Sequence, residues 1–369
     1  MVGIGDPMKV SPQLRKSIRM LLVCLSITPV WGSLAQQSTP PVESPVAAPA
    51  PADRHISLDV VVADKAGAPV SGLQQQDFKL LDQKSPQKIL SFRAVDQSTN
   101  EPPAEVILLI DAVNANFTTV SYERNQIERF LGQNDGKLAQ PVSIMFFEDT
   151  KTEVQRQPSR DGKALLASFD QNVTGLRNIS RSTGFYGAEE RLELSLKTLS
   201  ELAAYEATKP GRKLLVWISP GWPLLSGPRV DMSNAQQRAI FNSVVTMSAD
   251  LRRARITLYS VDPLGTNDAG SIRLTYYEEF LKGVTSPNRV EAGNLALQVL
   301  AIQSGGRVLN ASNDITDEIN RCVRDAGPHY ELTFEPAPAE HPDEYHGLQV
   351  NVDKPGLTVR TRTGYYAQP

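Results

Sequence analysis

The feature that most constrains the fold is a series of short apolar runs that alternate with longer segments of helical periodicity. The apolar runs cover residues 106–110, 142–147, 214–218 and 256–261. Strands as apolar as these are typical of a parallel sheet that helices cover on both faces. The helical segments between and after the runs cover residues 121–131, 189–205, 235–253 and 292–303. We therefore predict a Rossmann-like, doubly wound, mostly parallel α/β sheet flanked by helices over residues 103–326.

The segments on either side of this region have a different periodicity. Residues 54–98 and 327–369 both alternate apolar and polar side chains, as in Ile56, Leu58 and Val60 near the start and Leu348 and Val350 near the end. Such alternation indicates strands that are half-buried. Because each segment is marginal as an independent domain, we predict that the two pair into one small β-sandwich-like unit, into which the α/β domain is inserted.

The first 53 residues carry no such pattern. Residues 1–35 combine a basic start, an apolar stretch at 20–30 and a small-residue site at Ser33-Leu34-Ala35, which is typical of a signal peptide. The apolar stretch is too short to span a bilayer. Residues 36–53 are rich in Pro and Ala and predict a disordered linker. We expect an exported protein, periplasmic or extracellular, with no membrane span in the mature chain.

The charge balance and the cysteines limit the possible partners and bonds. The formal net charge is -3, which argues against nucleic acid as a partner. The densest basic cluster is Arg252, Arg253 and Arg255, and the end of a helix explains it as well as a phosphate site does. Only Cys322 lies beyond the signal peptide, so no disulfide forms within the mature chain. We expect Cys322 to be a small buried residue of a helix.

Asp111 ends the apolar run at 106–110 and is followed by a polar turn at 112–116. Ligands of open parallel sheets bind beyond the carboxyl ends of the strands, so Asp111 is a candidate metal ligand or catalytic carboxylate. Two other segments should reach the same edge. They are Ser182-Thr183-Gly184-Phe185-Tyr186, which opens a long amphipathic helix, and Trp217-Ile218-Ser219-Pro220-Gly221, which ends a strand.

These three segments resemble the three loops of a von Willebrand factor type A (VWFA) domain. The flanking stretches at residues 61–78 and 359–366, the latter reading Val-Arg-Thr-Arg-Thr-Gly-Tyr-Tyr, resemble the exported bacterial VWFA-related family. The resemblance covers roughly residues 54–366. It implies a Rossmann-like fold and a divalent cation, usually magnesium, held by an Asp-x-Ser-x-Ser loop, a Thr in the second loop and an Asp in the third.

Only some of the metal-ligand positions that the resemblance implies carry a suitable residue in this sequence. Asp111 matches the first Asp and Thr183 the Thr, but Val113, Ala115 and Pro220 stand where three oxygen ligands are expected. Magnesium requires oxygen ligands in octahedral geometry. We therefore predict a degenerate metal site, with no cofactor or at most weakly bound magnesium, in which Asp111 receives backbone N–H groups of its own turn. Substitute oxygens from Asn114, Asn116 or Ser219 are the alternative.

No catalytic motif is present in the sequence. His341, Asp343, Glu344 and His346 lie close together, but the spacing of the histidines and the intervening Pro342 oppose a metal-binding helix. We interpret them as a solvated turn. The sequence predicts a protein that is not an enzyme. The alternatives are a hydrolase using Asp111 and a metal at the same edge, and magnesium-dependent adhesion through Asp111 and Thr183.

Aromatic and amide side chains gather around the three loops. We predict that a protein partner, whose identity the sequence does not give, contacts the carboxyl edge of the sheet through Asn114, Asn116, Phe185, Tyr186 and Trp222. Aromatic side chains commonly dominate the binding energy of such contacts. Burial of these rings beneath the loops is the alternative. The resulting hypothesis is an exported, non-enzymatic protein-interaction module.

Overall fold

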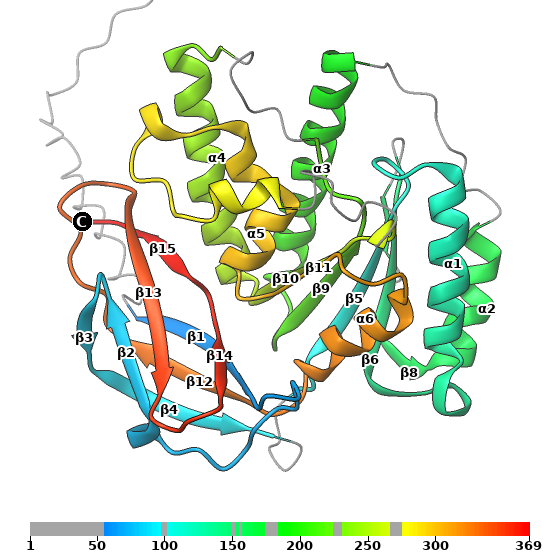
Figure 1. Cartoon of the computed structure of the whole chain (residues 1–369), viewed down its shortest axis with the longest axis horizontal. Coiled ribbons are helices and arrows are strands. Elements are labelled where there is room, and N and C mark those ends of the chain that lie inside the picture. The colour runs from blue at the N-terminus through cyan, green and yellow to red at the C-terminus, as the bar shows by residue number, and fades with distance from the viewer. Residues whose placement is uncertain are drawn as a thin grey trace, which may run out of the picture. The chain divides into compact units, whose positions relative to one another are not determined.

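The computed structural model describes residues 55–96, 102–148, 152–154, 157–173, 184–223, 231–265 and 275–369. The predicted signal peptide and linker, residues 1–35 and 36–53, lie outside these ranges, as does Thr183. Within them the chain builds an α/β domain and a β-sandwich (Figure 1). No helix in the described ranges is long and apolar enough to cross a membrane.

The α/β domain is built on a seven-stranded sheet in the order β11-β10-β9-β5-β6-β7, with β8 also pairing with β6. The pairs among β11, β10, β9, β5 and β6 are parallel, and β7 and β8 are antiparallel to β6. The strands are β5 (Glu105–Asp111), β6 (Lys137–Phe147), β7 (Thr152–Val154), β8 (Ser159–Asp161), β9 (Lys213–Ile218), β10 (Ile256–Val261) and β11 (Val308–Leu309). This mostly parallel order confirms the predicted doubly wound sheet.

Helices cover both faces of this sheet (Figure 1). The side chains of β5 point alternately to the two faces of the sheet. Val106 and Leu108 belong to one buried core and Ile107 and Leu109 to another, so both faces need a cover of helices. The first core includes side chains of α1 (Phe117–Leu131), α2 (Gly162–Val173) and α6 (Ile315–Arg324). The second includes side chains of α3 (Gly184–Glu206), α4 (Asn234–Arg253) and α5 (Leu297–Gln303). Cys322 lies in the first core with no exposed surface, which confirms its predicted burial.

Side chains at the helix starts fix where several of these helices begin. The Asn116 side chain accepts a hydrogen bond from Thr119 N at the start of α1, and Asp314 accepts one from Asp317 N at the start of α6. Ser233 and Gln236 form a capping box at the start of α4. Such caps satisfy backbone N–H groups that have no partner within the helix.

The segments on either side of the α/β domain form two four-stranded sheets around one core. One sheet has the order β14-β1-β12-β4 and the other β15-β13-β2-β3. Their strands are β1 (Ile56–Ala63), β2 (Phe78–Asp82), β3 (Ser85–Gln87), β4 (Ile89–Val95), β12 (His329–Phe334), β13 (Glu344–Val352), β14 (Thr358–Arg360) and β15 (Gly364–Ala367). Each sheet combines strands from both ends of the chain, which confirms the predicted sandwich with an inserted α/β domain.

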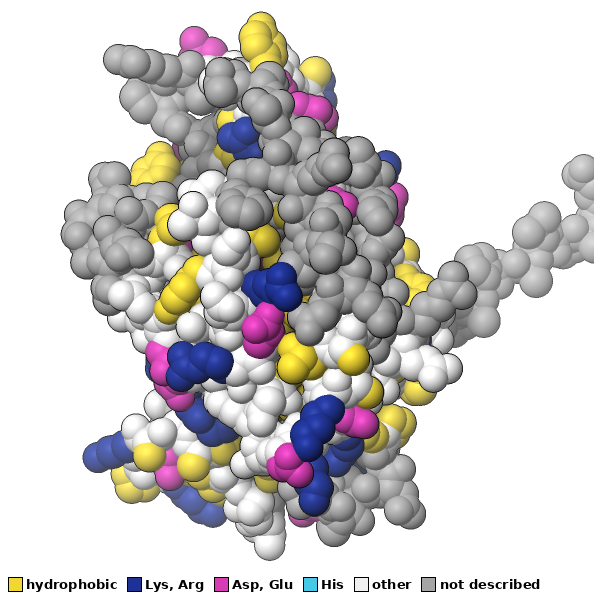
Figure 2. Space-filling view, turned by 90° about the vertical axis from the view of Figure 1, so that its right-hand side faces the viewer, with side chains coloured by type: hydrophobic (Ala, Val, Ile, Leu, Met, Phe, Trp, Pro, Cys, Tyr) yellow, Lys and Arg dark blue, Asp and Glu magenta, His cyan; other side chains and the backbone are white. Residues whose placement is uncertain are grey.

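The described surface carries charges of both signs. On the face shown in Figure 2, Lys and Arg side chains lie beside Asp and Glu side chains, and apolar side chains are scattered among them. Binding of nucleic acid depends on basic side chains that gather into a patch or stripe. The part of this face that is described shows no such patch.

Candidate functional site

Asp111 occupies the position in the sheet where ligands of this architecture bind. It is the last residue of β5, which lies between β6 and β9. The chain passes from β5 to β6 on one side of it, and β9, later in the sequence, lies on the other side. The strand order therefore reverses at β5, and such a switch point opens a crevice at the carboxyl ends of the strands. The carboxylate of Asp111 has no exposed surface.

Both carboxylate oxygens of Asp111 accept hydrogen bonds from the protein itself. Oδ1 accepts from Val113 N at 3.0 Å and Asn114 N at 2.8 Å. Oδ2 accepts from Asn114 Nδ2 at 2.8 Å and Trp217 Nε1 at 2.9 Å. Burial raises the pKa of Asp111, and the hydrogen bonds from Trp217 and Asn114 act against that rise. Four N–H donors fill the roughly four acceptor sites of a carboxylate.

The described residues at this edge offer a magnesium ion few free oxygen ligands, and Asn114 Oδ1 is the buried side-chain oxygen beside Asp111 that has no hydrogen-bond partner among them. A cation at Asp111 would have to displace N–H donors, whose positive ends already point at both oxygens. Val113 and Ala115 offer no side-chain oxygen, and the Ser219 hydroxyl accepts a hydrogen bond from Gly221 N at 3.1 Å. Magnesium prefers several oxygen ligands in octahedral geometry, and each carboxylate oxygen of Asp111 already accepts two hydrogen bonds.

The polar side chains that we predicted as partner contacts also have structural roles. Asn114 is half-buried and donates through Nδ2 to Ser195 Oγ of α3 at 3.0 Å, which ties the β5–α1 loop to that helix. Asn116 is exposed and caps α1, with its Oδ1 2.9 Å from Thr119 N.

Among the predicted aromatic contacts, the structure exposes one ring and buries another. Tyr186, in the first turn of α3, is 80% exposed. The side chain of Phe185 lies outside the description. Trp222 is only 3% exposed, and its ring centroid lies 4.9 Å from that of Trp217. The prediction that Trp222 contacts a partner is therefore wrong, because its indole is part of the core beneath the loops.

Sequence reasoning missed two buried acids near this edge, Glu123 on α1 and Glu318 on α6. Neither has a hydrogen-bond partner for its carboxylate oxygens among the described residues. Burial raises the pKa of Glu123 well above its usual value, and Asp111 and Asp262 raise it further. Burial also raises the pKa of Glu318, to about 7. Helical spacing could have revealed Glu123, since it lies four residues before the core residue Ile127.

The interpretation of His346 as part of a solvated turn is wrong. His346 lies on β13 and is 2% exposed. Its Nδ1 lies 3.1 Å from Asp82 Oδ1, and the Tyr365 hydroxyl donates to Asp82 Oδ2 at 2.7 Å. The strand alternation could have shown this, because His346, Leu348 and Val350 occupy the same inward face.

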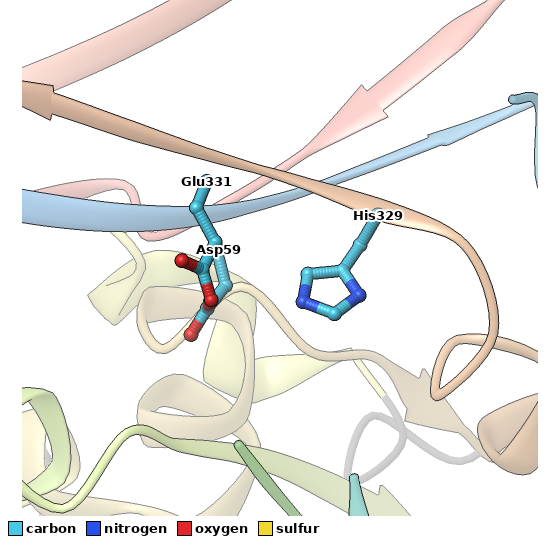
Figure 3. A group of neighbouring side chains, drawn as sticks. All are labelled: Asp59, His329 and Glu331. Carbon is cyan, nitrogen blue, oxygen red and sulfur yellow. The ribbon is translucent and has the colours of Figure 1, made fainter. Parts of the chain in front are cut away.

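A second polar cluster lies on the sandwich, facing the amino edge of the parallel sheet (Figure 3). Asp59 on β1 and His329 and Glu331 on β12 bring ligand atoms within 4.8 Å of one another. Beside them lies a cavity of about 410 Å³, whose lining includes Arg212 and Arg255. This volume lies within the range of small-molecule sites, and the sequence alone gave no indication of it.

The charges of this cluster are already balanced by arginine. Arg255 Nη2 donates to Asp59 Oδ1 at 2.6 Å and also to Glu331 Oε1, and Arg93 pairs with Glu331 Oε2. Burial works to raise the pKa of Asp59, but Arg212 and Arg255 hold it below its usual value. A metal ion at these three residues would compete with a guanidinium that is already in place. The cluster therefore works as an ionic link between the sandwich and the start of β10.

The strand order, the antiparallel strands at one edge and Asp111 at the switch point give this chain the doubly wound α/β fold that the sequence resemblance implies. Similar solved structures include manganese-loaded Plasmodium vivax TRAP protein, with 9% identity, 76% of this chain and 97% of that chain covered, and a TM-score of 0.35. The pilus adhesin SpaC from Lactobacillus rhamnosus GG has 8% identity, coverages of 79% and 49%, and a TM-score of 0.36.

A third similar structure is the SpRpn10 VWA domain, with 12% identity, coverages of 59% and 95%, and a TM-score of 0.28. This chain spans about half the length of the SpaC chain, 49%, and nearly all of the TRAP chain, 97%. No protein-family model matches the sequence, and no curated protein matches it significantly.

Proposed function

We propose that this protein is an exported, non-enzymatic interaction module that binds a protein partner at the carboxyl edge of its sheet without a divalent cation. One observation carries the proposal. The carboxylate of Asp111 is fully buried, and N–H groups of Val113, Asn114 and Trp217 occupy its oxygens. This arrangement supports a contact that uses neither a metal ion nor a substrate at Asp111.

The same edge offers groups suited to a protein contact. Tyr186 projects from the first turn of α3 with 80% of its surface exposed, and Asn116 is exposed at the start of α1. Tyrosine provides a large apolar ring with a polar end, and it is enriched where partners bind. Export is supported by the signal-peptide pattern of residues 1–35.

A site-specific cross-linking experiment tests the contact. A photoreactive amino acid replaces Tyr186 in one variant and Tyr205 in the other; Tyr205 lies at the opposite end of α3 and is 44% exposed. Irradiation in the exported fraction of the native host should yield one discrete protein adduct from position 186 and none from position 205. The yield should be equal with magnesium and with a chelator. Equal adducts from both positions, or loss of the adduct in chelator, would contradict the proposal.

Calorimetry with magnesium or manganese tests the cation separately. We expect no binding tighter than roughly millimolar, the weak end of the range for divalent sites in proteins. Tighter binding that Asp111→Ala abolishes would favour the alternatives in which a metal at this edge supports adhesion or hydrolysis.

A further inference from the structure

The motif at residues 359–366 contains two arginines with different surroundings. Arg360 forms two hydrogen bonds with Asp325, Nη1 to Oδ2 and Nη2 to Oδ1, both at 2.6 Å. Arg362 has no ion pair with any described carboxylate. Its hydrogen bond is a long one, from Nη1 to the Ser248 carbonyl oxygen at 3.5 Å. The sequence motif therefore contains one arginine with a partner of opposite charge and one without.

The same contrast occurs at the end of α4. Arg253 pairs with Asp250, with Nη1 2.8 Å from Oδ1. Arg252, the residue before it, has no ion pair within the part of the chain that the structure describes. Buried or half-buried arginines are usually paired with an acid, and both Arg252 and Arg362 are half-buried.

Arg252 and Arg362 line the same cavity, of about 170 Å³, between the sandwich and the end of α4. Arg255 also lines it but is bound to Asp59 and Glu331. Burial lowers the pKa of Arg362 to about 10, Arg252 contributes to this decrease, and Asp59 acts in the opposite direction. Both guanidinium groups are still protonated at neutral pH. The cavity thus holds two positive charges, and Asp59, the acid among its lining residues, is already paired with Arg255.

The end of helix α4 accounts for only part of this arrangement. Cations are favourable near the carboxyl end of a helix, where the dipole is equivalent to about half a negative charge. That effect suits Arg252 and Arg253 and explains the approach of Arg362 to the Ser248 carbonyl. Half a charge does not balance two guanidinium groups in a small cavity.

We propose that Arg252 and Arg362 bind a compact divalent oxyanion of the phosphate class in this cavity. The planar guanidinium matches such an anion with paired N–H donors, and a charge of about -2 at neutral pH balances the two arginines. The hydroxyls of Ser57 and Thr361 also line the cavity, although each already has a protein partner. This site is separate from the carboxyl edge, so it does not depend on the function proposed above.

Titration calorimetry of the full-length protein with inorganic phosphate, against sodium chloride of equal ionic strength, tests the proposal. We expect one phosphate per chain, and at least a tenfold loss of affinity in both Arg252→Gln and Arg362→Gln, because each variant removes a positive charge and its paired N–H donors. Arg253→Gln is the matched control and should bind as the unchanged protein does. Heat no greater than that of sodium chloride, or wild-type affinity in Arg362→Gln, would overturn the site.

Other anions and a folding measurement complete the test. Sulfate should replace phosphate, whereas acetate at the same concentration should not, and equal binding of acetate would refute a divalent site. Phosphate should raise the unfolding midpoint of the wild type and of Arg253→Gln alone. If Arg362→Gln does not fold, Arg362→Lys keeps the charge but loses the paired donors. Arg362→Lys should then bind phosphate more weakly than the wild type, and unchanged binding would count against the proposal.

Discussion

The two edges of the parallel sheet neutralise their acidic groups in opposite ways. At the carboxyl edge, Asp111 is surrounded by N–H donors, and burial favours the protonated form of Glu123. At the amino edge, Asp59 and Asp325 are paired with the guanidinium groups of Arg255 and Arg360. Neutral N–H groups and protonation neutralise the acids at the carboxyl edge. Charged guanidinium groups neutralise the acids at the amino edge. The acids of one edge are therefore neutralised without a counter-charge, whereas those of the other are neutralised by ion pairs.

The amino edge should be the more sensitive to loss of a single group. Asp325 is 1% exposed and accepts hydrogen bonds from Arg360 and Arg307 and from the Tyr259 hydroxyl. Asp325→Ala would leave the half-buried cations of Arg360 and Arg307 without their acid, and breaking a buried pair costs about 3–5 kcal/mol. Urea unfolding measures the effect. Arg253→Gln, which breaks an exposed pair, should change stability by less than about 1 kcal/mol, and similar losses in both variants would erase the contrast.

At the carboxyl edge, Asp111→Ala should lower the free energy of unfolding by about 3 kcal/mol, because several buried N–H groups would lose their acceptor. The decisive comparison is between unfolding in magnesium and in a chelator. We expect the same loss in both conditions. A loss that occurs only in magnesium would mean that Asp111 stabilises the fold through a cation.

The buried acids of the carboxyl edge should make the protein less stable as the pH rises. The folded-state pKa of Glu318 lies at about 7, above its ordinary value of 4.5. The native state therefore keeps a proton that the unfolded state releases, and stability decreases between those two pH values. Glu318→Gln should remove this decrease, which amounts to about 3 kcal/mol. Unfolding at both ends of the range provides the measurement, and an unchanged pH slope would contradict the assignment.

The smallest effect concerns Asn116, which both caps α1 and was predicted to contact a partner. Asn116→Ala should cost about 1 kcal/mol through loss of the cap, whereas Asn116→Asp keeps an acceptor for Thr119 N. Thermal unfolding separates the two variants. If cross-linking at position 186 falls in both variants, Asn116 itself contacts the partner. A fall only in Asn116→Ala would assign Asn116 to the helix alone.

The general architecture was predictable because each element carries its own pattern. The apolar run at 106–110 is buried along its whole length in β5, and neither terminal β segment was large enough to fold alone. Hydrogen bonds between distant elements were not predictable. Trp217 Nε1 reaches Asp111 across 106 residues of sequence because β5 and β9 pair with Leu109 opposite Trp217. That register is decided by the packing of the whole sheet and has no local signal.

The wrong predictions for Trp222 and His346 also have local physical causes. Trp222 follows Gly221, whose φ of +101° is a conformation that glycine adopts readily. At this turn the chain places the Trp222 indole against Trp217, although the sequence suited an exposed loop equally well. The sequence favours a turn near His346 because Pro342 precedes it. The strand β13 begins at Glu344, just early enough to carry the imidazole into the core.

The pairing of strands from both ends of the chain also affects the order in which contacts form during folding. Ser57 on β1 and Thr333 on β12 are 276 residues apart and face each other in one sheet. Contacts of such long range form late, because closing a large loop costs conformational entropy. We therefore expect β1 to pair with β12 only after the inserted domain has folded. Until it pairs, β1 is an open strand edge, and such edges are prone to aggregation.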